Sequence, residues 1–285
     1  MMIQPLLQDK RTRLLQVLKT FDRLAVALSG GVDSALLLAE ARDVLGNRVV
    51  AVTARSAIHP QHEVDDAARI AAELGVSHWM VDSTEMDRGD FLANTPERCY
   101  ICKKAVFSQL LNLIREHGFF HLAHGANRDD LGDYRPGMKA ARELGVVAPL
   151  IDAGFAKDDI RQLARARGLF VWDKPAMACL ATRFPYGTGI TPARVEQVRQ
   201  AEALLASVGL AACRVRYHGD VARIEVPVNA LSQVVVDPLR GRIVRRLRKI
   251  GFLHVAIDLE GYVAGSMNRS LDTDVVFRSH DRSSR

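Results

Sequence analysis

The sequence predicts an α/β fold in which a doubly wound, mostly parallel sheet is followed by a smaller α+β unit. Over the first 175 residues, short apolar runs alternate with longer amphipathic stretches that end at glycines. Apolar strands that alternate with helices are typical of parallel βαβ units whose sheet is covered on both faces. The pattern changes after about residue 175, where a segment rich in Pro, Gly and Thr precedes a helix and two short strands.

The first part of the chain opens with a predicted amphipathic helix over residues 3–20, in which leucines recur on one face. Each apolar run that follows has the length of a buried strand, and each longer stretch ends near a glycine, as helices commonly do. The predicted strands are Arg23–Leu28, Arg48–Thr53, Val76–Val81 and Phe119–Ala123. The predicted helices are Ser34–Leu45, Gln61–Leu74 and Cys102–His117.

The second part begins with a predicted loop over Lys174–Thr191, followed by a helix over Pro192–Val208 with proline in its first turn. Two strands around Gly219-Asp220 predict a hairpin. These strands are Cys213–His218 and Ala222–Val226, and a helix over Leu239–Ile250 and a strand over Leu253–Leu259 follow. We therefore expect a nucleotide-binding domain over 1–175, a small α+β domain over 176–270 and a disordered tail over 271–285.

Composition excludes several classes of protein. Of the 285 residues, 48% are hydrophobic, yet no apolar run is long enough to span a membrane and no signal peptide is expected at the start. Four cysteines in a chain of this length do not make a disulfide scaffold, so we expect a cytoplasmic protein. The net charge of +6 suits anionic partners. Six cations between residues 240 and 249 are interpreted as the solvated face of an amphipathic helix.

The most informative motif is Ser29-Gly30-Gly31-Val32-Asp33-Ser34, between a predicted strand and a predicted helix. Glycines let the backbone approach phosphate oxygens, and a helix N-terminus adds amide donors and partial positive charge. Ser29 and Ser34 supply further donors, and Asp33 suits Mg²⁺ or the capping of backbone amides. The motif has no lysine, so it is not the loop that grips phosphates for γ-phosphoryl transfer. The alternative is a glycine-rich turn with a capping aspartate.

This string resembles the PP-loop signature SGGxDS of the adenine nucleotide α-hydrolase group. The resemblance implies that ATP is cleaved between its α and β phosphates. It also implies that AMP is transferred to a substrate oxygen while the loop holds the departing pyrophosphate. The expected fold is therefore that of PP-loop enzymes, with ATP and Mg²⁺ as cofactors.

Five further segments narrow the resemblance. They are Glu97–Lys103, His124–Gly137, Lys174–Gly187, Arg214–Gly219 and Asp258–Tyr262. In this order they resemble the LarE-type sacrificial sulfur transferases, over roughly residues 10–270. The resemblance implies sulfur insertion during synthesis of a nickel-pincer cofactor. A pyridinium dicarboxylate mononucleotide would be adenylated at a carboxylate, and sulfur would remain on the product as a thiocarboxylate.

The resemblance assigns the nucleophile and sulfur position to Cys179. An acyl adenylate is a strong electrophile, and a thiolate is its natural attacker. Arg183, four residues on, is a cation that favours the thiolate and is also a candidate substrate ligand. The alternative for an isolated cysteine is a small buried core residue. The loop composition and the family match favour the nucleophile.

Cys99 and Cys102 form a CxxC pair at a predicted helix start. Such a pair suits a redox couple, half a zinc site or part of an iron–sulfur site. Some relatives use the loop cysteine alone, whereas others carry this pair and assemble a [4Fe–4S] cluster on three cysteines. The resemblance therefore implies Cys99, Cys102 and Cys179 as cluster ligands, and we favour this hypothesis. Cys213 is interpreted as a core residue.

The remaining site candidates are polar residues that the resemblance places around the nucleotide and the anionic substrate. Gly125 is assigned to ATP. Ser56 follows a predicted strand and is a candidate for contact with the adenine, with a plain loop serine as the alternative. Asn127, Asp130 and Arg135 follow a predicted strand, at the sheet edge where ligands bind, although a turn held by Asx hydrogen bonds is the alternative. Glu202, Arg214 and Arg216 are assigned to the substrate, with solvated strand arginines as the alternative.

Two other functions compete with sulfur transfer to a small anionic mononucleotide. A PP-loop enzyme that thiolates tRNA would use the cysteine pair for a cluster and the 240–249 cations for phosphates, with affinity that falls steeply with salt. No separate RNA-binding module is recognised, so nucleic acid is not an expected partner. A non-catalytic nucleotide-binding regulator is the third possibility, and the intact Cys179 loop argues against it. The family resemblance suggests a homo-oligomer.

Overall fold

The computed structural model describes residues 5–132, 136–175, 178–210 and 212–263, together with Ser266 and Arg269. The chain divides into two compact units. The first unit comprises Met1–Glu85 and Cys99–Met177, and the second comprises Met86–Arg98 and Ala178–Arg285. The tail predicted over 271–285 lies outside the described residues.

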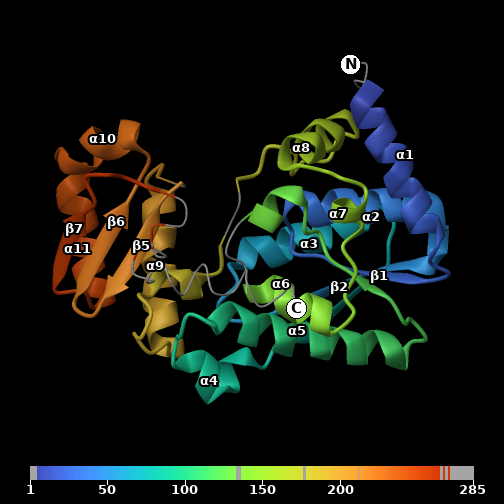
Figure 1. The fold of residues 1–285 in the computed structure, drawn as a ribbon. Coiled ribbons are helices and arrows are strands. Elements are labelled where there is room, and N and C mark those ends of the chain that lie inside the picture. The colour runs from blue at the N-terminus through green and yellow to red at the C-terminus, as the bar shows by residue number, and fades with distance from the viewer. Residues whose placement is uncertain are drawn as a thin grey trace. The chain divides into compact units, whose positions relative to one another are not determined.

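The first unit is built on a four-stranded parallel sheet (Figure 1). Its strands, in spatial order, are β3 (His78–Asp82), β2 (Val49–Arg55), β1 (Leu24–Ala27) and β4 (Leu122–Ala123). All three strand pairs are parallel, with Leu24 beside Val49 and Ala25 beside Leu122. Strand β4 is shorter than predicted, because the amide of Phe119 donates to the carbonyl of Ile114 in the turn that ends the preceding helix.

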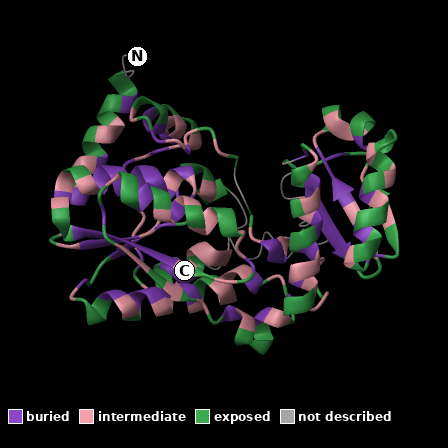
Figure 2. Cartoon of the chain, turned by 180° about the vertical axis from the view of Figure 1, so that it is seen from behind, coloured by how far each residue is buried: buried purple, intermediate pink, exposed green. Residues whose placement is uncertain are grey.

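Helices cover both faces of this sheet, which confirms the predicted doubly wound architecture (Figure 1). Val26 of β1 packs in the core on one face, and Ala25 packs in the core on the other. The first face is covered by α1 (Pro5–Lys19), α2 (Val32–Leu45), α3 (Gln61–Glu73), α7 (Pro149–Asp152) and α8 (Lys157–Ala166). The second is covered by α5 (Arg98–Glu116) and α6 (Pro136–Glu143). Figure 2 shows the buried strands between helices whose outer faces are exposed.

The second unit contains a three-stranded sheet in the order β5 (Arg214–His218), β6 (Val221–Glu225) and β7 (His254–Ile257). Strands β5 and β6 form the predicted antiparallel hairpin, and β7 joins β6 in parallel. Its helices are α4 (Gly89–Leu92), α9 (Pro192–Ser207), α10 (Leu231–Val235) and α11 (Leu239–Ile250). Helix α9 starts at an N-cap residue, Thr191, whose hydroxyl accepts from the amide of Arg194.

Helix α11 carries the cationic stretch on its exposed side and buries Ile243 and Leu247 on the other, as predicted. Short 3₁₀ segments complete the chain at Gly46–Arg48, Glu85–Asp87, Arg128–Gly132, Leu180–Arg183 and Val228–Ala230. None of the helices within the described ranges has the length and apolar character needed to span a bilayer.

Candidate functional site

The segment Ser29–Ser34, called the phosphate loop from here on, follows β1 and leads into α2, as the sequence predicted. It lies at the carboxyl end of β1, whose two neighbours in the sheet are β2 and β4. The chain reaches these neighbours in opposite directions, so the loop lies at the topological switch point where open α/β sheets bind ligands. Gly30 has a φ of +79°, and a Cβ there would overlap the backbone carbonyl oxygen of Glu63. Only glycine fits this turn.

The two serines of the loop, Ser29 and Ser34, are hydrogen-bonded to each other. The amide of Ser29 donates to Ser34 Oγ over 3.2 Å, and the two hydroxyl oxygens are also 3.2 Å apart. Ser34 Oγ lies 3.1 Å from the carbonyl oxygen of Gly31 and donates to it. The first amides of a helix have no partner inside the helix, so the start of α2 offers donors to an anion held by this loop.

Gly125, two residues after β4, lies against the first turn of α2. A Cβ at Gly125 would stand 2.7 Å from the amide nitrogen of Ser34 and 3.0 Å from the carbonyl carbon of Asp33. Both atoms belong to the backbone, so they have little freedom to retreat. Glycine at this position therefore allows the segment after β4 to approach the phosphate loop.

Two lysines that the sequence analysis missed flank the loop. Lys157, the first residue of α8, donates from Nζ to both carboxylate oxygens of Asp33, over 2.8 and 2.6 Å. Lys174 donates from Nζ to the carbonyl oxygen of Gly30 over 3.1 Å and also pairs with Glu63 and Asp66. The motif itself has no lysine, and both residues lie more than 120 positions along the chain from their partners in the loop.

The residues predicted at the edge beyond β4 form a local turn. The amide of Asn127 donates to Asp130 Oδ2 over 2.9 Å, and Asn127 Oδ1 accepts from the amide of Asp129 over 3.0 Å. These are the bonds of the Asx-turn alternative, and contact with a ligand stays a prediction. Ser56 follows β2, and its hydroxyl accepts from the amide of Ile58 over 3.3 Å. Arg135 lies outside the described residues.

Cys179 is half-buried and precedes the 3₁₀ segment Leu180–Arg183. Its carbonyl oxygen accepts from the amide and the hydroxyl of Thr182, over 3.0 and 2.8 Å, and from Arg183 Nη1 over 3.3 Å. The backbone at the candidate nucleophile is therefore held by several donors from the next four residues.

Arg183 is fully buried, and most of its donors are used within the second unit. Nε and Nη2 form a two-pronged pair with Glu202, over 2.8 and 3.0 Å, while Nη1 also reaches the carbonyl of Ala178. Glu202 accepts in addition from the amide of Val215 in β5 over 2.9 Å. The pair thus connects the Cys179 segment to α9 and to β5, and a direct substrate contact by either residue stays a prediction.

A second brace, also missed from the sequence, comes from the segment Met86–Arg98. Asn94 is buried with a φ of +55°, and its amide donates to the carbonyl oxygens of Pro185 and Thr188 over 2.7 and 2.8 Å. Arg98 Nη1 donates to the carbonyl oxygen of Ala181 over 2.9 Å. The loop after Cys179 is therefore held by two side chains that lie more than 80 positions earlier in the chain.

Arg214 and Arg216 are buried, so the interpretation of solvated strand arginines is wrong. Arg216 donates to Glu225 Oε2 over 2.6 Å and to the carbonyl oxygen of Thr182 over 2.9 Å. Arg214 donates to the carbonyl oxygen of Cys213 and lies 4.9 Å from the ring centre of Tyr262. Three guanidinium groups, including that of Arg183, therefore lie in the packed interior of the second unit.

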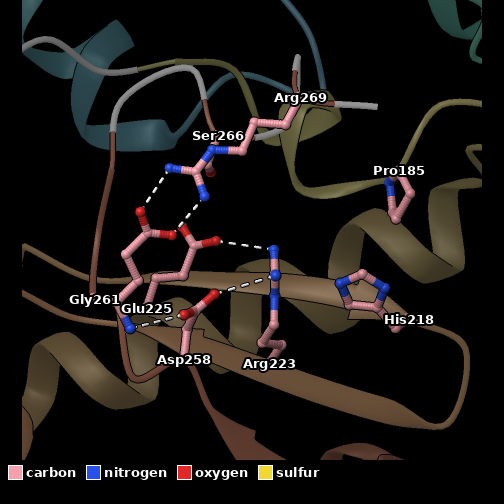
Figure 3. Close-up of a pocket in the computed structure, with 9 residues that line it drawn as sticks. Pro185, His218, Arg223, Glu225, Asp258, Gly261, Ser266 and Arg269 are labelled. Atoms are coloured by element: carbon pink, nitrogen blue, oxygen red, sulfur yellow. Dashed lines mark hydrogen bonds and ion pairs between the residues drawn. The ribbon is translucent and has the colours of Figure 1, made fainter. Parts of the chain in front are cut away.

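A cavity of about 370 Å³ lies beside this arginine group. Figure 3 shows the guanidinium group of Arg223 paired with the carboxylates of Glu225 and Asp258, at 3.0 and 3.1 Å. The charged residues that line the cavity are two arginines and three carboxylates, so the lining has a net charge of −1 with His218 neutral. Burial and the nearby arginines lower the pKa of His218. Glu225 accepts from both Arg223 and Arg216, and so joins the cavity to the arginine group.

The CxxC pair lies in the first two turns of α5. Cys99 and Cys102 are half-buried, and residues three apart share one face of a helix. They belong to the first unit, whereas Cys179 belongs to the second. Within the described ranges, no three His, Cys, Asp or Glu side chains are grouped so as to hold a metal ion. Cys213 is buried as predicted, and its burial raises the pKa of the thiol to about 12.

Comparison with known proteins gives two relatives that align with 93% of the chain. A family model described as Asparagine synthase matches residues 15–113. An uncharacterized protein of Synechocystis is 41% identical over 266 residues, which cover 93% of this chain and 99% of that protein. The pyridinium-3,5-bisthiocarboxylic acid mononucleotide synthase of Lactiplantibacillus plantarum is 40% identical over 269 residues, covering 93% and 96%. The tRNA-specific 2-thiouridylase MnmA of Pelobacter propionicus is 34% identical over 187 residues, covering 53% and 52%.

Proposed function

The chain belongs to the LarE-type family of pyridinium-3,5-bisthiocarboxylic acid mononucleotide synthases, and on this premise we propose how its two units divide the reaction. It is an ATP-dependent sulfurtransferase that acts on a pyridinium dicarboxylate mononucleotide and makes a thiocarboxylate for a nickel-pincer cofactor. The observation that carries this conclusion is the extent of the similarity. An alignment over 93% of the chain spans both the phosphate-loop unit and the Cys179 unit.

The first half-reaction belongs to the first unit. A carboxylate oxygen of the substrate attacks the α-phosphorus of ATP, and the bond to the bridging oxygen breaks. Pyrophosphate leaves with the bonding electron pair, and an acyl adenylate remains. The loop Ser29–Ser34 and the start of α2 would hold the departing pyrophosphate, because amide donors and partial positive charge stabilise an anion there.

The second half-reaction is assigned to Cys179. Its thiolate attacks the acyl carbon, AMP leaves with the electron pair of the C–O bond, and a thioester to the protein forms. In the sacrificial route a base then removes the Cα proton of the cysteine, and the Cβ–S bond breaks. The sulfur departs on the product as a thiocarboxylate, and dehydroalanine remains in the chain. The bonds around residues 178–183 support this role because they fix the backbone that carries the thiol.

The CxxC pair allows a second source of sulfur, which the sacrificial route does not need. Thiolates are the ligands that iron–sulfur clusters prefer, and the first unit alone supplies only two of them, so Cys179 would be the third. A [4Fe–4S] cluster held by three thiolates supplies one iron that is open to a sulfide. The presence of both Cys99 and Cys102 favours this source.

Intact-mass measurement separates the two sources. A sacrificial cysteine loses one sulfur and two hydrogens, so the mass of the chain falls by about 34 Da after a single turnover. With a cluster the mass stays constant, turnover requires sulfide, and Cys99→Ala is as damaging as Cys179→Ala. Multiple turnovers by a Cys99→Ala, Cys102→Ala double variant without iron would contradict the cluster.

For the anionic substrate we propose the second unit, because three of its buried side chains, Arg183, Arg214 and Arg216, are cations. Glu202 positions Arg183 within this group. Asp33 offers hard oxygen ligands at the phosphate loop, and the bound Mg²⁺ would neutralise phosphate charge there. The cytoplasmic location and the homo-oligomer stay predictions.

Thiolation of tRNA is the competing function. The similarity to the tRNA-specific 2-thiouridylase covers 53% of this chain, which is too little to include both units in full. The cations of α11 are the feature that would bind RNA phosphates. Binding of a bulk tRNA sample that weakens steeply between low and moderate salt would favour this alternative, because each neutralised phosphate releases counterions.

A further inference from the structure

The phosphate loop lacks a lysine of its own, yet the ammonium group of Lys157 lies at its mouth. We infer that Lys157 is the cation that holds the phosphates of ATP, and that Asp33 retains it until Mg²⁺ and nucleotide arrive. This inference rests on the proposed function, since it takes ATP as the ligand of the loop. It starts from the ion pair in which Lys157 Nζ donates to both oxygens of Asp33, over 2.8 and 2.6 Å.

The backbone of Lys157 is anchored independently of that pair. Its amide donates to Asp129 Oδ2 over 2.8 Å, and the amide of Asp129 in turn donates to Asn127 Oδ1 over 3.0 Å. Lys157 also begins α8, which Lys10 ties to α1 through an ion pair with Asp159 at 2.5 Å. The stem of the lysine is therefore fixed beside the loop, while the four-carbon side chain can redirect its ammonium group without moving the backbone.

Comparison with Lys174 shows which of the two lysines can change partners. The ammonium group of Lys174 contacts two carboxylates, those of Glu63 and Asp66, and a backbone carbonyl, and its side chain is 16% exposed. Among the described residues, the ammonium group of Lys157 has one acidic partner, Asp33, and the side chain of Lys157 is 28% exposed. Lys174 therefore serves as a fixed clamp on the loop, whereas Lys157 can be released by competition for a single carboxylate.

The expected Mg²⁺ supplies that competition. Asp33 would hold the ion, because a divalent cation prefers carboxylate oxygens and binds together with substrate phosphates, and the ammonium group of Lys157 would then be released from Asp33. The released ammonium then lies beside a triphosphate that carries several negative charges. A charge-assisted hydrogen bond to a phosphate oxygen stabilises bound ATP and also the charge that grows on pyrophosphate as it leaves. Lys157 thus exchanges one anionic partner for another within the reach of its side chain.

A double-mutant cycle on ATP affinity tests this exchange without turnover. Binding of ATP and Mg²⁺ is measured by calorimetry, with no carboxylate substrate present, for the wild type, Lys157→Met, Asp33→Asn and the double variant. Lys139→Met is the matched control, because it removes an ammonium group from an exposed ion pair with Glu143 within α6, which covers the opposite face of the sheet from α8. Thermal melting of each variant confirms that it is folded.

If Lys157 binds phosphate, Lys157→Met weakens ATP binding about tenfold or more, whether residue 33 is Asp or Asn. Lys157→Arg should recover part of the loss, and Lys139→Met should bind as the wild type does. If the lysine only neutralises Asp33, the cost of Lys157→Met disappears in the Asp33→Asn background, and the inference is overturned. If the wild type binds ATP and Lys157→Met binds it as tightly as Lys139→Met does, the inference alone is overturned. Failure of the wild type to bind ATP overturns the proposed function together with it.

Discussion

Gly125→Ala is expected to disable the phosphate loop from a position outside the motif. The added methyl group would stand 2.7 Å from the amide nitrogen of Ser34, 3.0 Å from the carbonyl carbon of Asp33 and 3.1 Å from the Cα of Ser34. All three atoms are backbone atoms in the first turn of α2, so relief requires that turn to move away from the segment after β4. Overpacking of this kind costs about 1–3 kcal/mol of unfolding free energy.

The same displacement moves the amides that face the phosphates. We therefore expect ATP affinity to fall about tenfold or more, since one charge-assisted hydrogen bond contributes about 1.5–3 kcal/mol. The melting temperature should fall by about 2–4 °C per kcal/mol for a unit of this size. Calorimetric ATP titration and thermal melting measure the two effects.

Gly132→Ala is the matched control, because a Cβ there meets no atom of the described residues within 4 Å. It should leave both the ATP affinity and the melting temperature close to the wild-type values. Equal ATP affinity and melting temperature for Gly125→Ala and Gly132→Ala would refute the close approach on which the reasoning depends.

Three further predictions concern the groups that surround the site. Arg183→Met leaves the partly buried carboxylate of Glu202 without its guanidinium partner, so the free energy of unfolding of the second unit, measured in urea, should fall by about 3–5 kcal/mol. Arg199 forms an exposed ion pair with Glu196, so Arg199→Met should change that free energy by less than about 1 kcal/mol. Lys174→Met should weaken ATP binding equally in the wild-type and Asp33→Asn backgrounds, because Lys174 donates to the carbonyl oxygen of Gly30 rather than to Asp33. Recovery of ATP affinity in the Asp33→Asn background would contradict this role of Lys174. Burial lowers the pKa of His124 to about 4, so between about pH 6.5 and pH 4 the unfolded chain takes up a proton that the folded chain does not. The free energy of unfolding should therefore fall as the pH decreases through this range, by at most about 1.4 kcal/mol per pH unit. His124→Gln should flatten that part of the urea-midpoint profile between pH 7.5 and 5, and an unchanged slope would contradict the assignment.

The parallel sheet and the phosphate loop were predictable because their signals are local. Strand β2 starts with the continuous apolar run Val49–Val52, and the six residues from Ser29 to Ser34 carry glycine and hydroxyl groups in one string. Helices α6 to α8 were not predicted. They are only 4–10 residues long, too short for a periodic pattern to stand out, although Ile160, Leu163 and Ala164 do share the buried face of α8.

The partners of the site residues could not be predicted, because they come from distant parts of the chain. Lys157 reaches Asp33 across 124 positions, and Asn94 reaches Pro185 across 91. No local pattern indicates such pairs, and only the packing of α8 against α2, or of residues 86–98 against the Cys179 loop, creates them. Burial of Arg214 and Arg216 was missed for a similar reason, since alternation in a strand separates two faces without showing which one is covered.

Adenylation followed by sulfur transfer is tested most directly by the products of one reaction. The chain is incubated with ATP, Mg²⁺ and a pyridinium dicarboxylate mononucleotide, both with and without added iron and sulfide, and the small molecules are identified by mass spectrometry. We expect AMP, pyrophosphate and a product about 16 Da heavier than the substrate, because one carboxylate oxygen is replaced by sulfur. Cys179→Ala should still release pyrophosphate but yield no heavier product. Formation of ADP and phosphate, or of AMP with no sulfur on the mononucleotide, would contradict the account.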